Sequence, residues 1–131
     1  MNKPYFLIEG NFYKSYCFPA LNQYLIEVGK NPKKGNELKQ RYVYIAITYI
    51  RNYLKGWKTT RPVKIHYVFG EPNKGQKRDY DNVVGLAMKY IHDALRDTKT
   101  IVDDKPEYVK NFDFEFVYVD VPFIRVEIEE L

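Results

Sequence analysis

The sequence predicts an α+β fold in which two helices pack on one small mixed or antiparallel sheet of about four strands. Apolar residues recur at helical spacing in residues 37–54 and 82–97. Four other segments have the apolar or alternating pattern of strands: residues 5–9, 63–69, 112–118 and 124–128. The resulting order of strand, helix, strand, helix, strand, strand is typical of helices layered on a sheet. With 131 residues and no repeat or linker, residues 1–131 are expected to form a single domain.

Polar, Gly and Pro residues predict where these elements begin and end. Asn36 is a plausible N-cap for the first helix, and Gly56 is expected to stop it. Asp81 stands where the N-cap of the second helix is expected. Gly29 marks a turn, and residues 31–36, with the sequence NPKKGN, are expected to form a mobile basic loop.

Charge is distributed unevenly along the chain, although the net charge is only +4. Residues 1–78 contain 15 Lys and Arg against 4 acidic residues, whereas residues 79–131 contain 6 against 13. A basic half followed by an acidic half suggests a surface that binds a polyanion beside a cluster of carboxylates. Two oppositely charged, solvated faces would give the same composition.

Cysteine content and hydropathy indicate the cellular setting. Cys17 is the single cysteine, so neither an intramolecular disulfide nor a cysteine-based metal site is expected. The first residues contain no apolar run long enough for a signal peptide or a membrane span. We therefore expect a cytoplasmic protein that does not enter the membrane.

Asp79 and Asp81 are the first candidate metal ligands. In extended backbone, residues two apart point the same way, with Cα atoms roughly 6.5–7 Å apart. Both carboxylates could then reach one Mg²⁺ ion, which needs only one or two protein carboxylates and keeps water and substrate phosphate as its other ligands. Alternatively, these aspartates only cap the helix that follows.

Asp103 and Asp104 form a second acidic pair, which alone would indicate a polar turn. Between the two pairs lies an amphipathic helix, and a basic loop precedes the first pair. This arrangement resembles the RusA family of Holliday junction resolvases over about 30 residues. The matching residues are Arg78, Asp79, Asp81, Asn82, Lys89, Asp93, Ala94, Leu95, Val102, Asp103 and Asp104, with a weaker echo in residues 18–22.

The resemblance implies a homodimer that cuts branched DNA with Mg²⁺, or with Mn²⁺ in its place. It implies that Asp79, Asp81 and Asp104 bind the metal and act in catalysis. In the family pattern an assisting lysine follows the second aspartate by four residues, and that position is Gly85 in this chain. Lys89 matches the family lysine instead if the helix has one extra turn. An insertion of one turn leaves each side chain on nearly the same face of the helix. Five basic residues are expected to contact DNA: Lys33, Lys34, Lys74, Lys77 and Arg78.

The helix between the acidic pairs sets a geometric condition. A helix of 16 residues spans roughly 24 Å, so Asp81 and Asp104 would lie at its two ends. Either the helix is shorter than its pattern, or the site is completed across a dimer interface.

The function expected from these observations is Mg²⁺-dependent hydrolysis of phosphodiester bonds in Holliday junctions, in DNA recombination and repair. Three alternatives stay open: a non-catalytic DNA-binding dimer, a metal-dependent nuclease for other substrates such as flaps or forks, and a structural dimer with a solvated acidic surface. His66 is a conceivable general base, but its place in an alternating strand favours an ordinary exposed histidine.

Overall fold

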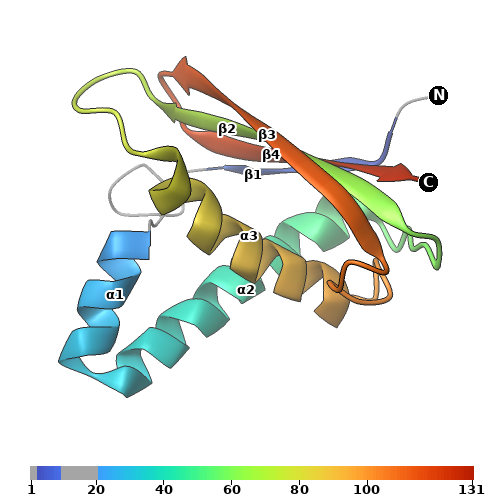
Figure 1. Ribbon diagram of the computed structural model, residues 1–131, viewed down its shortest axis with the longest axis horizontal. Coiled ribbons are helices and arrows are strands. Elements are labelled where there is room, and N and C mark those ends of the chain that lie inside the picture. Colours follow the sequence, from blue (N-terminus) through green and yellow to red (C-terminus); the bar gives the residue numbers. More distant parts are fainter. Residues whose placement is uncertain (1–2, 10–20) are drawn as a thin grey trace.

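The computed structural model describes residues 3–9 and 21–131, except for the side chains of residues 21–23. Within these ranges the chain forms one four-stranded mixed sheet with three helices, and the α+β prediction is confirmed (Figure 1). The three helices lie on one side of the sheet, and no described helix covers its other face, called the open face below (Figure 1). Among the described residues, no helix is long and apolar enough to cross a membrane.

The sheet has the order β1-β4-β2-β3. Its strands are β1 (Tyr5–Glu9), β2 (Val63–Pro72), β3 (Val109–Val119) and β4 (Phe123–Glu130). Strand β4 pairs antiparallel with both β1 and β2, whereas β3 runs parallel to β2 and forms one edge.

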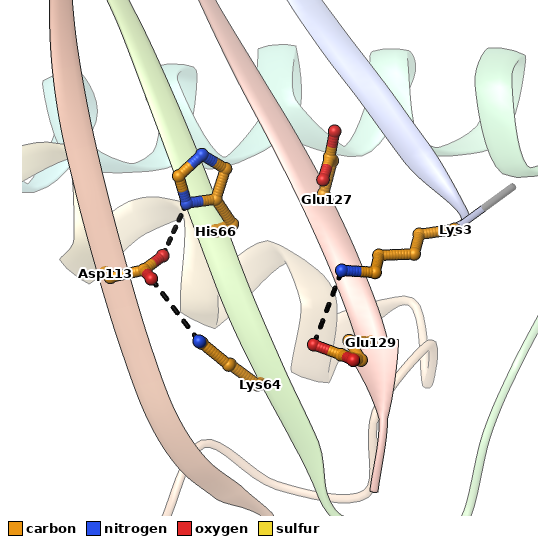
Figure 2. A pocket seen from close by; sticks show the side chains of 6 residues that line it. All are labelled: Lys3, Lys64, His66, Asp113, Glu127 and Glu129. Carbon is orange, nitrogen blue, oxygen red and sulfur yellow. Dashed lines mark hydrogen bonds and ion pairs between the residues drawn. The ribbon is translucent and has the colours of Figure 1, made fainter.

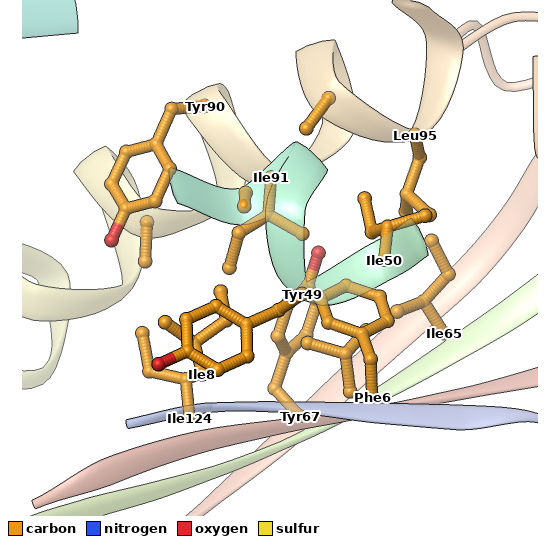
Figure 3. Packing of buried hydrophobic residues seen from close by; sticks show 14 of the residues in the cluster. Phe6, Ile8, Tyr49, Ile50, Ile65, Tyr67, Tyr90, Ile91, Leu95 and Ile124 are labelled. Atoms are coloured by element: carbon orange, nitrogen blue, oxygen red, sulfur yellow. The ribbon is translucent and has the colours of Figure 1, made fainter. Parts of the chain in front are cut away.

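The helices are α1 (Leu21–Lys30), α2 (Pro32–Leu54) and α3 (Tyr80–Asp97). Alternate residues of the central strands meet the apolar faces of α2 and α3 in a single core (Figure 3). The fully buried members include Phe6, Ile8, Ile65, Tyr67, Ile91, Leu95 and Ile124. Buried residues of α3 from Val83 to Leu95 belong to this core, so packing fixes the position of the helix.

The beginning of α2 differs from the prediction. Residues 32–36 are the first turn of the helix and not a mobile loop, and the N-cap is Asn31, whose Oδ1 accepts a hydrogen bond of 3.0 Å from the Lys33 N–H. Asn followed by Pro suits a turn, but it suits an N-cap followed by the first helical residue equally well. Gly29 likewise lies inside α1, a third helix that the sequence pattern did not predict. The predicted stop is correct, since Lys55 and Gly56 both have positive φ, at 51° and 87°.

Candidate active site

The N-terminal end of α3 presents two exposed carboxylates, those of Asp79 and Asp81. Asp79, and not Asp81 as predicted, occupies the N-cap position, with extended backbone at φ −68° and ψ 145°. Its side chain makes no capping hydrogen bond to the helix. Asp81 follows in the first turn, where the positive end of the helix dipole favours a negative charge. Helix capping therefore does not account for the Asp79 carboxylate.

The loop before Asp79 is anchored by an ion pair between Arg78 and Glu71. Arg78 donates from Nε to Oε1 and from its Nη2 to Oε2 of Glu71, each at 2.8 Å. The Glu71 side chain is only 4% exposed. It is buried because β2 continues to Pro72, beyond the end that alternation predicts. This bidentate geometry holds the guanidinium on Glu71, so we expect Arg78 to position the loop rather than to contact phosphate.

The other predicted DNA-binding residues fall into two places. Lys74 and Lys77 are exposed on the loop that leads into α3, and the Lys77 Nζ lies 4.5 Å from the centre of the Tyr118 ring. Lys33 and Lys34 lie in the first turn of α2, next to its junction with α1, and the Lys34 Nζ lies 3.5 Å from Glu27. Of these four lysines, Lys74 and Lys77 share the loop that leads to Asp79.

Asp104 stands near the other end of α3. Its Oδ2 lies 3.7 Å from Nη1 of Arg96 in the last turn, and its backbone N–H donates to Oδ1 of Asp103 at 2.7 Å. Hydrogen bonds from Asp104, together with the nearby charges of Lys105 and Arg96, hold the pKa of Asp103 below its usual value. Asp103 therefore keeps its negative charge and orients the turn that carries Asp104.

The length of α3 separates Asp104 from the first acidic pair. The helix has 18 residues, so it is not shorter than its pattern predicts. At 1.5 Å per residue, about 22 Å lies between the levels of Asp81 and Arg96. Among the described residues, no three His, Cys, Asp or Glu side chains lie close enough to hold one metal ion. Within one chain, Asp79 and Asp81 thus both belong to the start of α3, whereas Asp104 lies near its other end.

Lys89 lies on the exposed surface of α3, between the two acidic ends. It follows Asp81 by eight residues, which is about 12 Å along the helix axis. Gly85, one turn closer to Asp81, is also exposed, and a Cβ atom added there would meet nothing within 4 Å. The helix thus has room for a side chain at the position where the family pattern places its lysine.

The open face of the sheet carries a second polar cluster, which the sequence pattern did not single out. A cavity of about 250 Å³ is lined by Lys3, Lys64, His66, Asp113, Glu127 and Glu129 (Figure 2). His66 Nδ1 lies 2.5 Å from Asp113 Oδ1, and its Nε2 lies 3.4 Å from Glu115. These contacts raise the pKa of His66, the bond to Asp113 most of all. Because carboxylates engage both ring nitrogens, His66 is part of an ion-pair network and not a solitary exposed histidine.

Comparison with known proteins finds no matching protein-family model and no matching curated protein. The resemblance to the RusA family therefore depends on sequence motifs, chiefly the one in residues 78–104. Its weaker part, residues 18–22, includes positions 18–20, which lie outside the described residues, as does Cys17.

Proposed function

We propose that this chain is a Mg²⁺-dependent endodeoxyribonuclease of the RusA type, which resolves branched DNA during recombination and repair in the cytoplasm. The observation that carries the proposal is the pair of exposed carboxylates at the start of α3, one of which, Asp79, leaves the helix uncapped. The basic side chains of Lys74 and Lys77 on the adjoining loop support it, because they attract the phosphates that carboxylates alone would repel.

The donor set fits a hard divalent cation. Asp79 and Asp81 supply oxygen ligands, which Mg²⁺ prefers, and their exposure leaves space for water and a substrate phosphate. Mn²⁺ accepts the same oxygen donors. When bound, the metal supplies an activated water and neutralises charge on the phosphoryl oxygens.

The residues of the chain have separate roles in this proposal. Lys74 and Lys77 draw the DNA backbone toward the start of α3, and the ion pair of Arg78 with Glu71 fixes the loop that carries them. Asp79 and Asp81 hold the cation. Lys89 is exposed on the same helix and stabilises negative charge on the leaving oxygen or the neighbouring phosphate.

Asp104 completes the site only from a second copy of the chain. The 18-residue α3 removes the alternative of a shorter helix, so we propose that Asp79 and Asp81 of one subunit share a cation with Asp104 of the partner subunit. A two-fold dimer then has two equivalent sites, which suits symmetric cutting of a four-way junction.

The test is incubation of the protein with a synthetic four-way junction and with linear duplex, with and without Mg²⁺. We expect metal-dependent nicking of the junction by the wild type and its loss in Asp81→Asn. The control is Asp97→Asn, which removes an exposed carboxylate at the other end of α3 and should leave nicking unchanged.

Each result bears on one part of the proposal. Absence of nicking by the wild type in Mg²⁺ and in Mn²⁺ would overturn the enzyme assignment. Equal cutting of both substrates would leave a nuclease without junction specificity. Salt-sensitive binding of DNA that persists in Asp79→Asn, without cutting, would identify a non-catalytic DNA-binding protein.

A further inference from the structure

An exposed aromatic ring stands between the two carboxylates at the start of α3. Tyr80 separates Asp79 from Asp81 in the sequence and is the first residue of the helix. It is 58% exposed, although burial of an aromatic ring is strongly favourable. Packing in the core therefore does not account for most of the surface of this side chain.

Two phenylalanines of β3 hold the Tyr80 ring in place. The centre of the ring lies 4.7 Å from that of Phe116, with the two planes at 86°, and 5.9 Å from that of Phe114. The rings of Phe114 and Phe116 also support each other, with their centres 6.0 Å apart. Aromatic pairs at these separations attract each other. Tyr80 is thus oriented by its neighbours while most of its side chain remains open to a ligand.

The exposed rings continue along β3 and adjoin a lysine. Phe114, Phe116 and Tyr118 occupy alternate positions of the strand, so their side chains lie on the same face of the sheet. The Lys77 Nζ lies 4.5 Å from the centre of the Tyr118 ring, and Lys77 itself is exposed. Aromatic rings and a positive charge therefore share the surface beside Tyr80.

The charges around Tyr80 indicate which ligand suits the ring. The cores of protein–protein interfaces are depleted of charged residues, whereas Tyr80 lies between two aspartates and three residues after Lys77. Surfaces that bind unpaired nucleic-acid strands combine exposed rings with positive side chains, because bases stack on the rings and cations contact phosphates. The two carboxylates suit such a strand when a divalent cation lies between them and a phosphate. The surroundings therefore favour DNA with unpaired bases.

We propose that Tyr80 stacks on an unpaired base beside the phosphate that is cut, and so selects branched DNA with unpaired bases over continuous duplex. Tyr80 is the neighbour in sequence of both proposed metal ligands, so a base on its ring belongs to a nucleotide next to the cation. In continuous duplex, a base must first leave its stack and its pair, which costs free energy that an unpaired base does not require. The inference rests on the proposed function and specifies its substrate.

The first experiment compares the binding of two DNA molecules with the same number of nucleotides, a continuous duplex and a fork with unpaired arms. Binding is measured in Ca²⁺, which carboxylate oxygens also bind, and gel analysis verifies that no strand is cut. We expect the wild type to bind the fork about fivefold more tightly or better, the contribution of one base stacked on an aromatic ring. Tyr80→Leu should bind both molecules equally, whereas Tyr80→Phe should keep the preference because it keeps the ring.

Two controls separate stacking from packing. Tyr44→Leu replaces another exposed tyrosine, which is 68% exposed on α2, and should keep the preference for the fork. The circular dichroism and thermal unfolding of Tyr80→Leu should stay close to those of the wild type, since leucine retains apolar contact with Phe114 and Phe116. A residue that only packs against β3 would not change the ratio of the two affinities.

The second experiment locates the contact by photo-cross-linking to DNA that carries 5-iodouracil at an unpaired position. Irradiated iodouracil couples to an aromatic ring that stacks on it. Trypsin releases residues 79–89 as one peptide, in which Tyr80 is the single aromatic residue. We expect the DNA to be attached to this peptide. Equal affinity of the wild type for fork and duplex, an unchanged preference in Tyr80→Leu, or cross-links to other peptides alone would overturn the inference.

The inference and the proposed function fail in different ways. A preference for unpaired bases that requires Tyr80, in a protein that cuts no DNA in Mg²⁺ or Mn²⁺, would keep the stacking site and remove the nuclease. Metal-dependent cutting in which Tyr80→Leu leaves the ratio of branched to duplex cutting unchanged would keep the nuclease and remove the stacking site.

Discussion

The Arg78 guanidinium and the Glu71 carboxylate form a two-point ion pair that joins the end of β2 to the loop before α3. Glu71 is almost wholly buried, so its carboxylate has lost most of its contact with water. The Arg78 guanidinium offsets much of the free-energy cost of burying this charge. The pair connects folding to the candidate site, because the residue after Arg78 is Asp79. A change at either partner is therefore expected to affect stability and the position of the carboxylates together.

Arg78→Ala is expected to destabilise the fold by about 3–5 kcal/mol, because it leaves a buried carboxylate without its partner. The free energy of unfolding in urea, compared with that of Lys77→Ala at the neighbouring exposed position, measures the effect. The double variant Arg78→Met with Glu71→Leu should recover most of the loss, since an apolar pair needs no compensating charge. Unchanged stability of Arg78→Ala with much weaker DNA binding would instead assign Arg78 to phosphate contact.

Gly85→Ala is expected to stabilise the protein by about 0.5–1 kcal/mol, because Gly in a helix interior is less favourable than Ala and the added Cβ meets no atom. Gly70→Ala should have the opposite effect, since a Cβ there would overlap the Phe123 ring and force it to move. Thermal unfolding of both variants checks the pair of predictions. A destabilised Gly85→Ala would mean that the exposed side of α3 is covered in the intact protein.

His66 is expected to titrate above the ordinary histidine pKa of about 6.5, and His92 below it. The bond to Asp113 raises the pKa of His66, with a smaller contribution from Glu115, whereas burial lowers the pKa of His92. The charged His66 therefore stabilises the fold fully below about pH 6.5, and this contribution is lost as the pH rises through the folded pKa. The pKa of Asp113 is lowered, so the stabilisation from its negative charge is lost only when the pH falls through that lowered pKa.

An NMR titration of the two histidines checks this prediction, since the chain has no others. In Asp113→Asn the His66 midpoint should fall toward the ordinary value while that of His92 stays in place. A His66 midpoint at or below 6.5 in the wild type would contradict the ion-pair network on the open face.

The periodic segments of the sequence predict the fold because burial imposes the same periods on the structure. The central strands and the stripe of α3 follow their patterns closely. The prediction is wrong where one local sequence pattern is compatible with two structures. Asn31-Pro32 is compatible with a turn or with the start of a helix, and α2 starts there. The alternation of residues 112–118 predicts a strand, but it does not indicate that this strand lies at an edge of the sheet, where Phe112 and Phe114 stay exposed. Strand order is a non-local property that alternation does not encode.

The candidate site is predictable only in part, for a similar reason. Spacing predicts that Asp79 and Asp81 stand near each other, but the extended backbone assumed for both holds only for Asp79, because Tyr80 and Asp81 belong to the first turn of α3. The partner of Arg78 was not predicted, since the burial of Glu71 depends on how far β2 extends. The position of Asp104 depends on the length of α3 and, in our proposal, on a second chain.

Mixing two inactive variants tests whether the site is shared between subunits. Asp81→Asn and Asp104→Asn are each expected to lose cutting, because each removes one ligand from both sites of its own dimer. In a mixed dimer, one site combines both changes, whereas the other combines an intact Asp81 with an intact Asp104 of the partner subunit. With random exchange, half of the dimers are mixed and each has one good site, so nicking should return to about a quarter of the wild-type rate. If each chain instead held a complete site, the mixture would remain as inactive as its components, and the position of Asp104 near Arg96 would be unrelated to metal binding.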